Sequence, residues 1–100
     1  MLKAAFMFVA PEANPGEHRA IIRTPVVELH VVGVKNYDEA CEVAKKLVED
    51  GIAAIELCGG FGHIGVARVV EAVGGKVPVG VVRFDVHPGL EGKSGDGIFG

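Results

Sequence analysis

The feature that most restricts the fold of this chain is an alternation of short apolar runs with segments that carry helix signals. The clearest helix begins at Asn36, an N-cap residue followed three positions later by Glu39, and it ends at Gly51. Between these ends the apolar residues recur at helical spacing, at Ala40, Val43, Ala44, Leu47 and Val48. Such a helix must pack its apolar side against another element, and the flanking runs predict the strands of a sheet.

Four apolar, largely β-branched runs predict strands at residues 3–9, 26–34, 52–58 and 77–84. Two further helices are predicted between them. One covers about 15–23: it begins with an asparagine cap at Asn14 and a proline in its first turn, and Thr24-Pro25 ends it. The other ends at Gly74-Gly75 and is marked by apolar residues at helical spacing, which are Val66, Val69, Val70 and Val73.

The resulting order, β-α-β-α-β-α-β, predicts a single α/β domain over residues 1–100. Strands that are separated by helices pair in parallel through right-handed crossovers, so we expect four mainly parallel strands in a half-barrel-like or open sheet. A ferredoxin-like α+β sandwich is the alternative, if one connection is a hairpin. From about residue 88 to residue 100 the chain is rich in glycine and predicts an irregular tail.

Side-chain alternation predicts the two faces of the sheet. The residues expected to pack under the helices are Val27, Leu29 and Val31, then Ala53, Ile55 and Leu57, then Val82 and Phe84. The opposite face carries polar residues, among them Glu28, His30 and Glu56. With helices on one side only, that mixed face is a barrel interior, a solvent face or a subunit interface.

Composition limits the partners. The net charge is −3 without a stripe of lysine or arginine, which argues against nucleic acid, and no apolar run approaches the roughly 20 residues of a membrane span. A hydrophobic fraction of 49% is high for so small a domain and predicts a homo-oligomer. Cys41 and Cys58 lack C-x-x-C spacing and predict reduced thiols in a cytoplasmic protein.

Ligands of parallel α/β sheets bind beyond the carboxyl ends of the strands, and two such ends here carry reactive side chains. Gly59, Gly60 and Gly62 lie between a strand and a helix that has no side-chain cap of its own, so their N–H groups and the helix dipole favour an anion. A tight turn is the alternative interpretation. The anion would be neutralised by Arg83, with Asp85 and His87 beside it. The glycines do not form a dinucleotide fingerprint, and we expect no cofactor.

Glu56 and His63 are the candidate catalytic residues. Glu56 interrupts an apolar strand, and a buried carboxylate is costly unless it is paired or neutral. Arg83, on the next strand, is its expected partner. The pair is then either structural or part of an acid–base site. The spacing of the histidines and carboxylates matches no zinc pattern, so no metal site is expected.

Several stretches resemble a small prokaryotic family of unknown function. They are residues 10–13, 31–37, 54–63 (AIELCGGFGH), 81–85 (VVRFD) and 87–89, and the similarity spans almost the whole chain. The resemblance assigns no catalytic residue. Residues 47–56 are also similar to a helix-strand unit of barrel aldolases that cleave keto-deoxy-sugar phosphates, in which a strand glutamate acts at the place of Glu56. Those enzymes need a Schiff-base lysine on a later strand, where this chain has Arg83.

Together these patterns predict a domain that binds a small anionic metabolite. The same domain could also be an enzyme that acts on a carboxylate or phosphate metabolite. The alternative is a non-catalytic oligomeric assembly module in which Glu56 and Arg83 form a structural pair.

Overall fold

Five strands form one sheet in the computed structural model, which describes all of residues 1–100. The strands are β1 (Leu2–Val9), β2 (Arg19–Arg23), β3 (Val27–Val34), β4 (Ala54–Leu57) and β5 (Val79–Val81), and their order across the sheet is β2-β3-β1-β4-β5. β1 lies in the centre and pairs in parallel with β3 and β4, and β4 pairs in parallel with β5. Only the edge strand β2 is antiparallel, to β3. The mainly parallel α/β class is therefore confirmed, as an open sheet.

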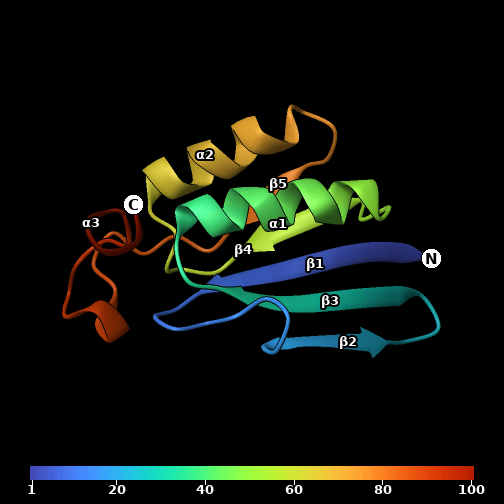
Figure 1. The fold of residues 1–100 in the computed structure, drawn as a ribbon, viewed down its shortest axis with the longest axis horizontal. Helices are drawn as coiled ribbons and strands as arrows, with labels where there is room; N and C mark the ends of the chain where they lie inside the picture. Colours follow the sequence, from blue (N-terminus) through green and yellow to red (C-terminus); the bar gives the residue numbers. More distant parts are fainter.

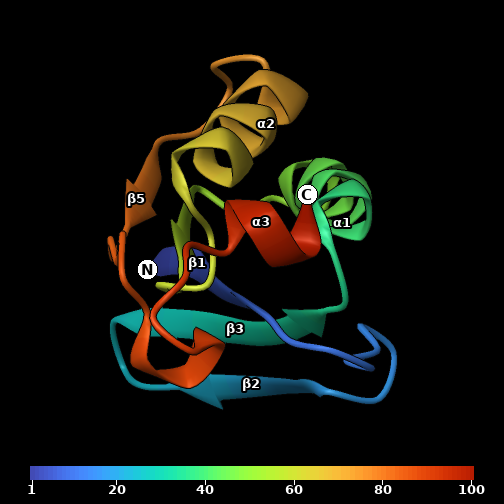
Figure 2. The same ribbon diagram turned by 90° about the vertical axis from the view of Figure 1, so that its left-hand side faces the viewer.

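Both long helices cover the same face of the sheet, and the other face carries no helix (Figure 1, Figure 2). α1 (Tyr37–Glu49) begins as predicted, because the Asn36 Oδ1 accepts a hydrogen bond of 2.9 Å from the Glu39 N–H. α2 (His63–Val73) ends at Gly74, whose φ of 61° is a left-handed cap. No helix is long and apolar enough to cross a membrane.

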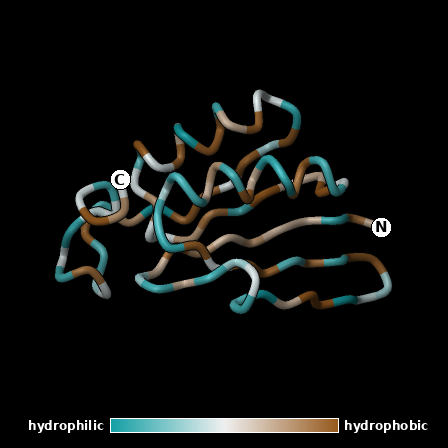
Figure 3. Tube along the Cα trace, in the orientation of Figure 1, coloured by the Kyte–Doolittle hydropathy of each residue, from teal (hydrophilic) through white to brown (hydrophobic).

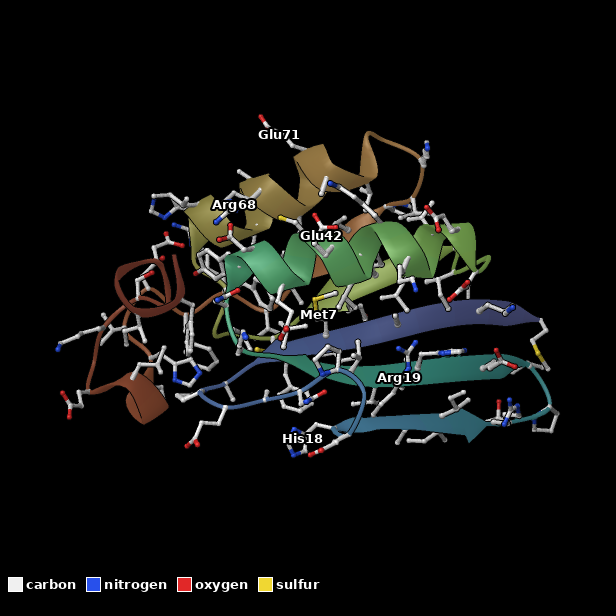
Figure 4. All side chains as sticks on the ribbon, viewed as in Figure 1. Met7, His18, Arg19, Glu42, Arg68 and Glu71 are labelled. Carbon is white, nitrogen blue, oxygen red and sulfur yellow. The ribbon has the colours of Figure 1, made fainter.

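The core fills the layer between the sheet and these helices. Met7 of β1 lies in this layer beneath α1, as Figure 4 shows. Hydrophobic residues follow the strands and alternate with hydrophilic ones around both helices (Figure 3). The largest fully buried side chains are Tyr37, Phe61, Met7, Leu47, Ile55, Leu57, Val32, Val34 and Val69. The sheet is thus packed on one side only, in agreement with the predicted single helix layer.

The predicted helix at about 15–23 is wrong, because this segment forms a turn and then β2. Asn14 does accept a hydrogen bond from the Gly16 N–H, but only one turn follows before the β-branched pair Ile21-Ile22. The hydroxyl of Thr24 accepts hydrogen bonds from the N–H groups of the next two valines and closes a hairpin between β2 and β3. Thr24-Pro25 is therefore a hairpin turn between two strands.

The predicted face of β3 is also wrong. The register places Ala5 of β1 beside His30 and Met7 beside Val32, so the even-numbered residues of β3 face the helices. Val32 and Val34 are fully buried there, and this burial sets the register of the strand. Leu29 and Val31 consequently lie on the face without helices.

The end of the chain differs from the prediction as well. The strand expected at 77–84 is shorter, with β5 limited to Val79–Val81, and the tail expected to be irregular contains two short helices, η1 (Pro88–Leu90) and α3 (Asp96–Phe99). Phe99 is buried against Tyr37, with ring centroids 6.5 Å apart. The tail crosses the carboxyl ends of the strands and returns to the starts of the two long helices (Figure 2).

Gly65 tests the packing between the helices. A Cβ at this position would collide with the buried ring of Tyr37, so Gly65→Ala should lower the free energy of unfolding by about 1–3 kcal/mol. In a helix interior, replacing glycine by alanine ordinarily raises the free energy of unfolding by about 0.5–1 kcal/mol. A decrease would therefore indicate the collision with Tyr37. Urea unfolding measures the change. Gly97→Ala, in α3 with open space around it, is the control and should not destabilise the fold.

Candidate functional site

Asp96 of the C-terminal tail occupies the N-terminus of α2, where the sequence predicts an anion. Its Oδ2 accepts a hydrogen bond of 3.1 Å from the Ile64 N–H, and its Oδ1 accepts one of 3.1 Å from the Gly65 N–H and one of 2.8 Å from the Tyr37 hydroxyl. Burial opposes ionisation, but these three bonds hold the pKa of Asp96 below its ordinary value of 3.8. The chain thus supplies its own carboxylate to this helix end.

Tyr37 connects this carboxylate to the loop between β4 and α2. Its hydroxyl accepts a hydrogen bond of 3.0 Å from the Gly62 N–H, and its ring stacks on Phe61 with centroids 5.5 Å apart. Burial raises the pKa of Tyr37 above its ordinary value of 10.0, and the Gly62 N–H opposes that rise. The hydroxyl therefore stays protonated at neutral pH and donates to Asp96.

The three glycines of the predicted anion cradle are packed against side chains of the same molecule. A Cβ at Gly59 would meet the ring of Phe84, and one at Gly62 would meet Asp96. Gly60 lies under Val9, and its N–H donates to the Cys58 Sγ at 3.3 Å. None of the three has a positive φ. Close packing against Phe84, Val9 and Asp96 therefore accounts for the absence of side chains at Gly59, Gly60 and Gly62. Residues 58–61 do form a tight turn, closed by a hydrogen bond of 3.1 Å from the Phe61 N–H to the Cys58 carbonyl oxygen, but the positive φ expected of its glycines is wrong.

The expected anion-binding residues after β5 form local contacts of their own. The Arg83 Nε donates to the Asp85 Oδ1 at 2.9 Å, and both side chains are exposed. The His87 Nδ1 accepts a hydrogen bond from the Gly89 N–H and caps η1, and its ring meets the edge of Phe84. Arg83 uses one of its donors in this pair, and its two terminal nitrogens form no other hydrogen bond.

A pocket of about 120 Å³ nevertheless brings three predicted site residues together. It lies between the start of α2 and the end of β5, and Gly62, His63 and Arg83 contribute to its wall. The His63 Nδ1 lies 3.5 Å from the Asp96 Oδ2, and the His63 side chain is exposed. The remaining lining is apolar and consists of Phe61, Val66, Val81 and Val82.

Glu56 does not belong to this pocket. It lies on the face without helices, where its neighbours in the register are Phe6 and Gly80, and its side chain is exposed and forms no ion pair. The expected pair with Arg83 is not formed, because β5 ends at Val81 and Arg83 has left the sheet to contact Asp85. The two candidate catalytic residues, Glu56 and His63, are therefore on different surfaces.

A second polar cluster lies at the opposite end of the sheet, on the helix side. The His30 Nε2 and the Glu28 Oε2 are 2.8 Å apart, and Arg23 and Lys3 also approach Glu28. The contact with His30 is the main reason that the pKa of Glu28 is lowered. The Nδ1 atom of His30 is buried and has no hydrogen-bond partner. This cluster joins the edge strand β2 to β3 and β1.

Tyr37 and Asp96 organise the site, but neither was among the site residues predicted from the sequence. Tyr37 was visible only as an aromatic residue directly after the N-cap Asn36. Asp96 lies in a glycine-rich segment, where no local pattern predicts its contact with α2 from 31 or 32 residues away. The uncapped start of α2 was the one signal that a distant acceptor was needed.

Asp96→Ala tests the cap. Losing the carboxylate leaves the Ile64 and Gly65 N–H groups without their acceptor, so the free energy of unfolding should fall by about 1–2 kcal/mol in denaturant at pH 7. Asp85→Ala removes an exposed carboxylate and should change stability by less than about 0.5 kcal/mol. Equal losses in the two variants would contradict a capping role for Asp96.

The cap should also make stability depend on pH. Because the folded-state pKa of Asp96 is lowered, its contribution is complete above the ordinary value of 3.8 and is lost as the pH falls through the lower folded-state value. Denaturant curves recorded from pH 6 to pH 2 should therefore converge for the parent chain and Asp96→Ala at the acid end. A constant difference across this range would argue against a charged cap.

Comparison with known proteins assigns this chain to a family. Searches of curated proteins and of solved structures returned no significant match, so the similarity of residues 47–56 to barrel aldolases gains no support. Residues 2–97 match the model of a family of unknown function, DUF6506. Because this match leaves out only the first residue and the last three, the chain belongs to the DUF6506 family of unknown function.

Proposed function

We propose that this protein binds a small anionic metabolite in the pocket between the start of α2 and the end of β5. The observation that carries the proposal is the meeting of Gly62, His63 and Arg83 in one cavity. Arg83 supplies a permanent positive charge with free donors at the cavity wall. The anion does not use the end of α2, since Asp96 already fills it.

The cavity favours a carboxylate with a short apolar body over an inorganic anion. Most of its lining is aliphatic or aromatic and includes Val66, Val81 and Val82. Its volume of about 120 Å³ corresponds to roughly four water molecules and excludes drug-sized ligands. The ligand would place its carboxylate at Arg83 and its apolar part on the valines.

An enzymatic form of this proposal depends on His63. Its imidazole lies at the cavity wall and approaches Asp96, which can orient it as a proton acceptor or donor. Glu56 has no part in such a reaction because it faces the other side of the sheet. Binding is therefore the primary proposal.

Isobutyrate and phosphate are suitable probes. Isobutyrate should bind more tightly and shift the amide resonances of Gly62, His63 and Val82 in NMR titrations. At ten times its dissociation constant it should raise the melting temperature by about 5–10 °C. Arg83→Gln should weaken binding by about 3–10-fold at low salt and by less at high salt, because screening already reduces an exposed charge.

Lys76→Gln is the matched control. It removes an exposed cation beyond the end of α2, away from this cavity, and should leave isobutyrate affinity unchanged. If neither probe moves these resonances at 50 mM, or if the two variants behave alike, the pocket does not bind small anions.

A homo-oligomeric assembly is the second proposed function, supported by the apolar residues on the uncovered face of the sheet. These include Leu2, Phe6, Leu29 and Val31.

We place the protein in the cytoplasm on the basis of Cys41 and Cys58, which are separate thiols and form no disulfide.

A further inference from the structure

The face of the sheet opposite the helices is more apolar than an exposed face should be. We call it the bare face and define it by residues from four strands: Leu2, Ala4, Phe6 and Phe8 of β1, Val27, Leu29 and Val31 of β3, Ala20 and Ile22 of β2, and Ala54 of β4. Sheets with one solvated face normally alternate apolar and polar residues. Here the polar residues of β1 and β3, which are Lys3, Glu28 and His30, lie on the helix side instead.

The bare face carries no charged residue on β1, β2 or β3. The ring of Phe8 lies over Gly33, where any Cβ would come within 2.5–3.1 Å of it. The charged residue on this side of β4 is Glu56, and its side chain lies over Gly80 of the edge strand β5, with Cγ 3.7 Å from the position of a Cβ there. Glu56 is the register neighbour of Phe6, but its side chain extends over β5 and so lies at the side of the face away from β3.

The size of the bare face suits a dimer. Strands spaced about 4.8 Å apart, with eight residues in each central strand and five and four in the two outer ones, outline roughly 400 Å². Two such faces in contact would remove roughly 800 Å² from water, which is the size of a small interface. A face of this size fits a weak, reversible dimer.

A second copy of the chain is the occupant that fits these properties. The face offers no positive charge to nucleic acid or to an anionic membrane, and its single carboxylate lies at the rim. An uncharged apolar surface is complementary to itself, so a two-fold axis brings no like charges together at its centre. Sheets that pack face to face in this way form a sandwich about 10 Å thick.

We propose that two copies of this protein pack their bare faces together around a two-fold axis, with Leu29 and Phe6 at the centre and Glu56 at the rim. The inference rests on the homo-oligomer proposed above and names its interface. The dimer leaves the pocket at α2 and β5 outside the contact, because that pocket is lined by residues of the helix side and of the carboxyl edge.

Sedimentation equilibrium of the full chain between 1 and 200 µM tests the interface. The parent chain should show twice its monomer mass of 10.4 kDa at the upper concentrations. Leu29→Lys and Ile22→Lys should each weaken the dimer by at least about 100-fold, because every dimer would bury two new charges. Ile22 is 54% exposed, so its replacement carries little risk to folding. Val70→Lys is the control on the outer side of α2, where 45% of the residue is exposed, and should leave the dimer intact.

The outcomes separate the two claims. A parent chain that stays monomeric at 200 µM overturns both the homo-oligomer and the interface. A dimer that persists in both Leu29→Lys and Ile22→Lys overturns the interface alone. Monomers in these two variants, with native circular dichroism and a dimeric Val70→Lys, support it. The Glu56→Gln variant should form a dimer as tight as that of the parent chain or tighter, because the Glu56 carboxylate has no ion-pair partner at the rim. A weaker dimer would contradict this placement of Glu56.

Discussion

The contact of Asp96 with the first turn of α2 is the interaction on which the carboxyl edge of this fold depends. It satisfies two N–H groups that an uncapped helix leaves free, and it does so with a charge that the helix dipole favours. Tyr37 joins the same carboxylate to α1 and to Gly62. One side chain from the end of the chain thus fixes both helices and the loop after β4, and Gly62 of that loop has no room for a side chain because Asp96 lies directly on it.

The distribution of polar groups over the sheet follows from a second constraint. β3 must place Val32 and Val34 in the core beside β1, and with a period of two this commits Glu28 and His30 to the same face. On that face Glu28 pairs with His30 and with Arg23 of the hairpin. The other face of the same strands then receives only apolar residues, so the bare face is a consequence of the register.

The elements with strong local signals could be predicted from the sequence, and those fixed by distant contacts could not. The helix after Asn36 and the parallel pairing of the first two long strands depend on caps and apolar runs. The segment at 15–23 combined a valid cap at Asn14 with residues of high β-propensity, and pairing with β3 decided between them. At the site, Gly62, His63 and Arg83 were expected to meet and do, whereas Glu56 was assigned a partner that β5 is too short to hold.

The same geometry separates binding from assembly. The pocket opens where α2 begins and β5 ends, and its cationic wall belongs to loops that the tail holds in place. The bare face is built from strands of the sheet, on the side opposite the two long helices (Figure 1, Figure 2). A ligand at Arg83 would therefore not touch Leu29 or Phe6, because the proposed interface lies on the central strands and the pocket lies at the carboxyl edge. The two proposed activities would depend on different residues, so the loss of one should leave the other in place.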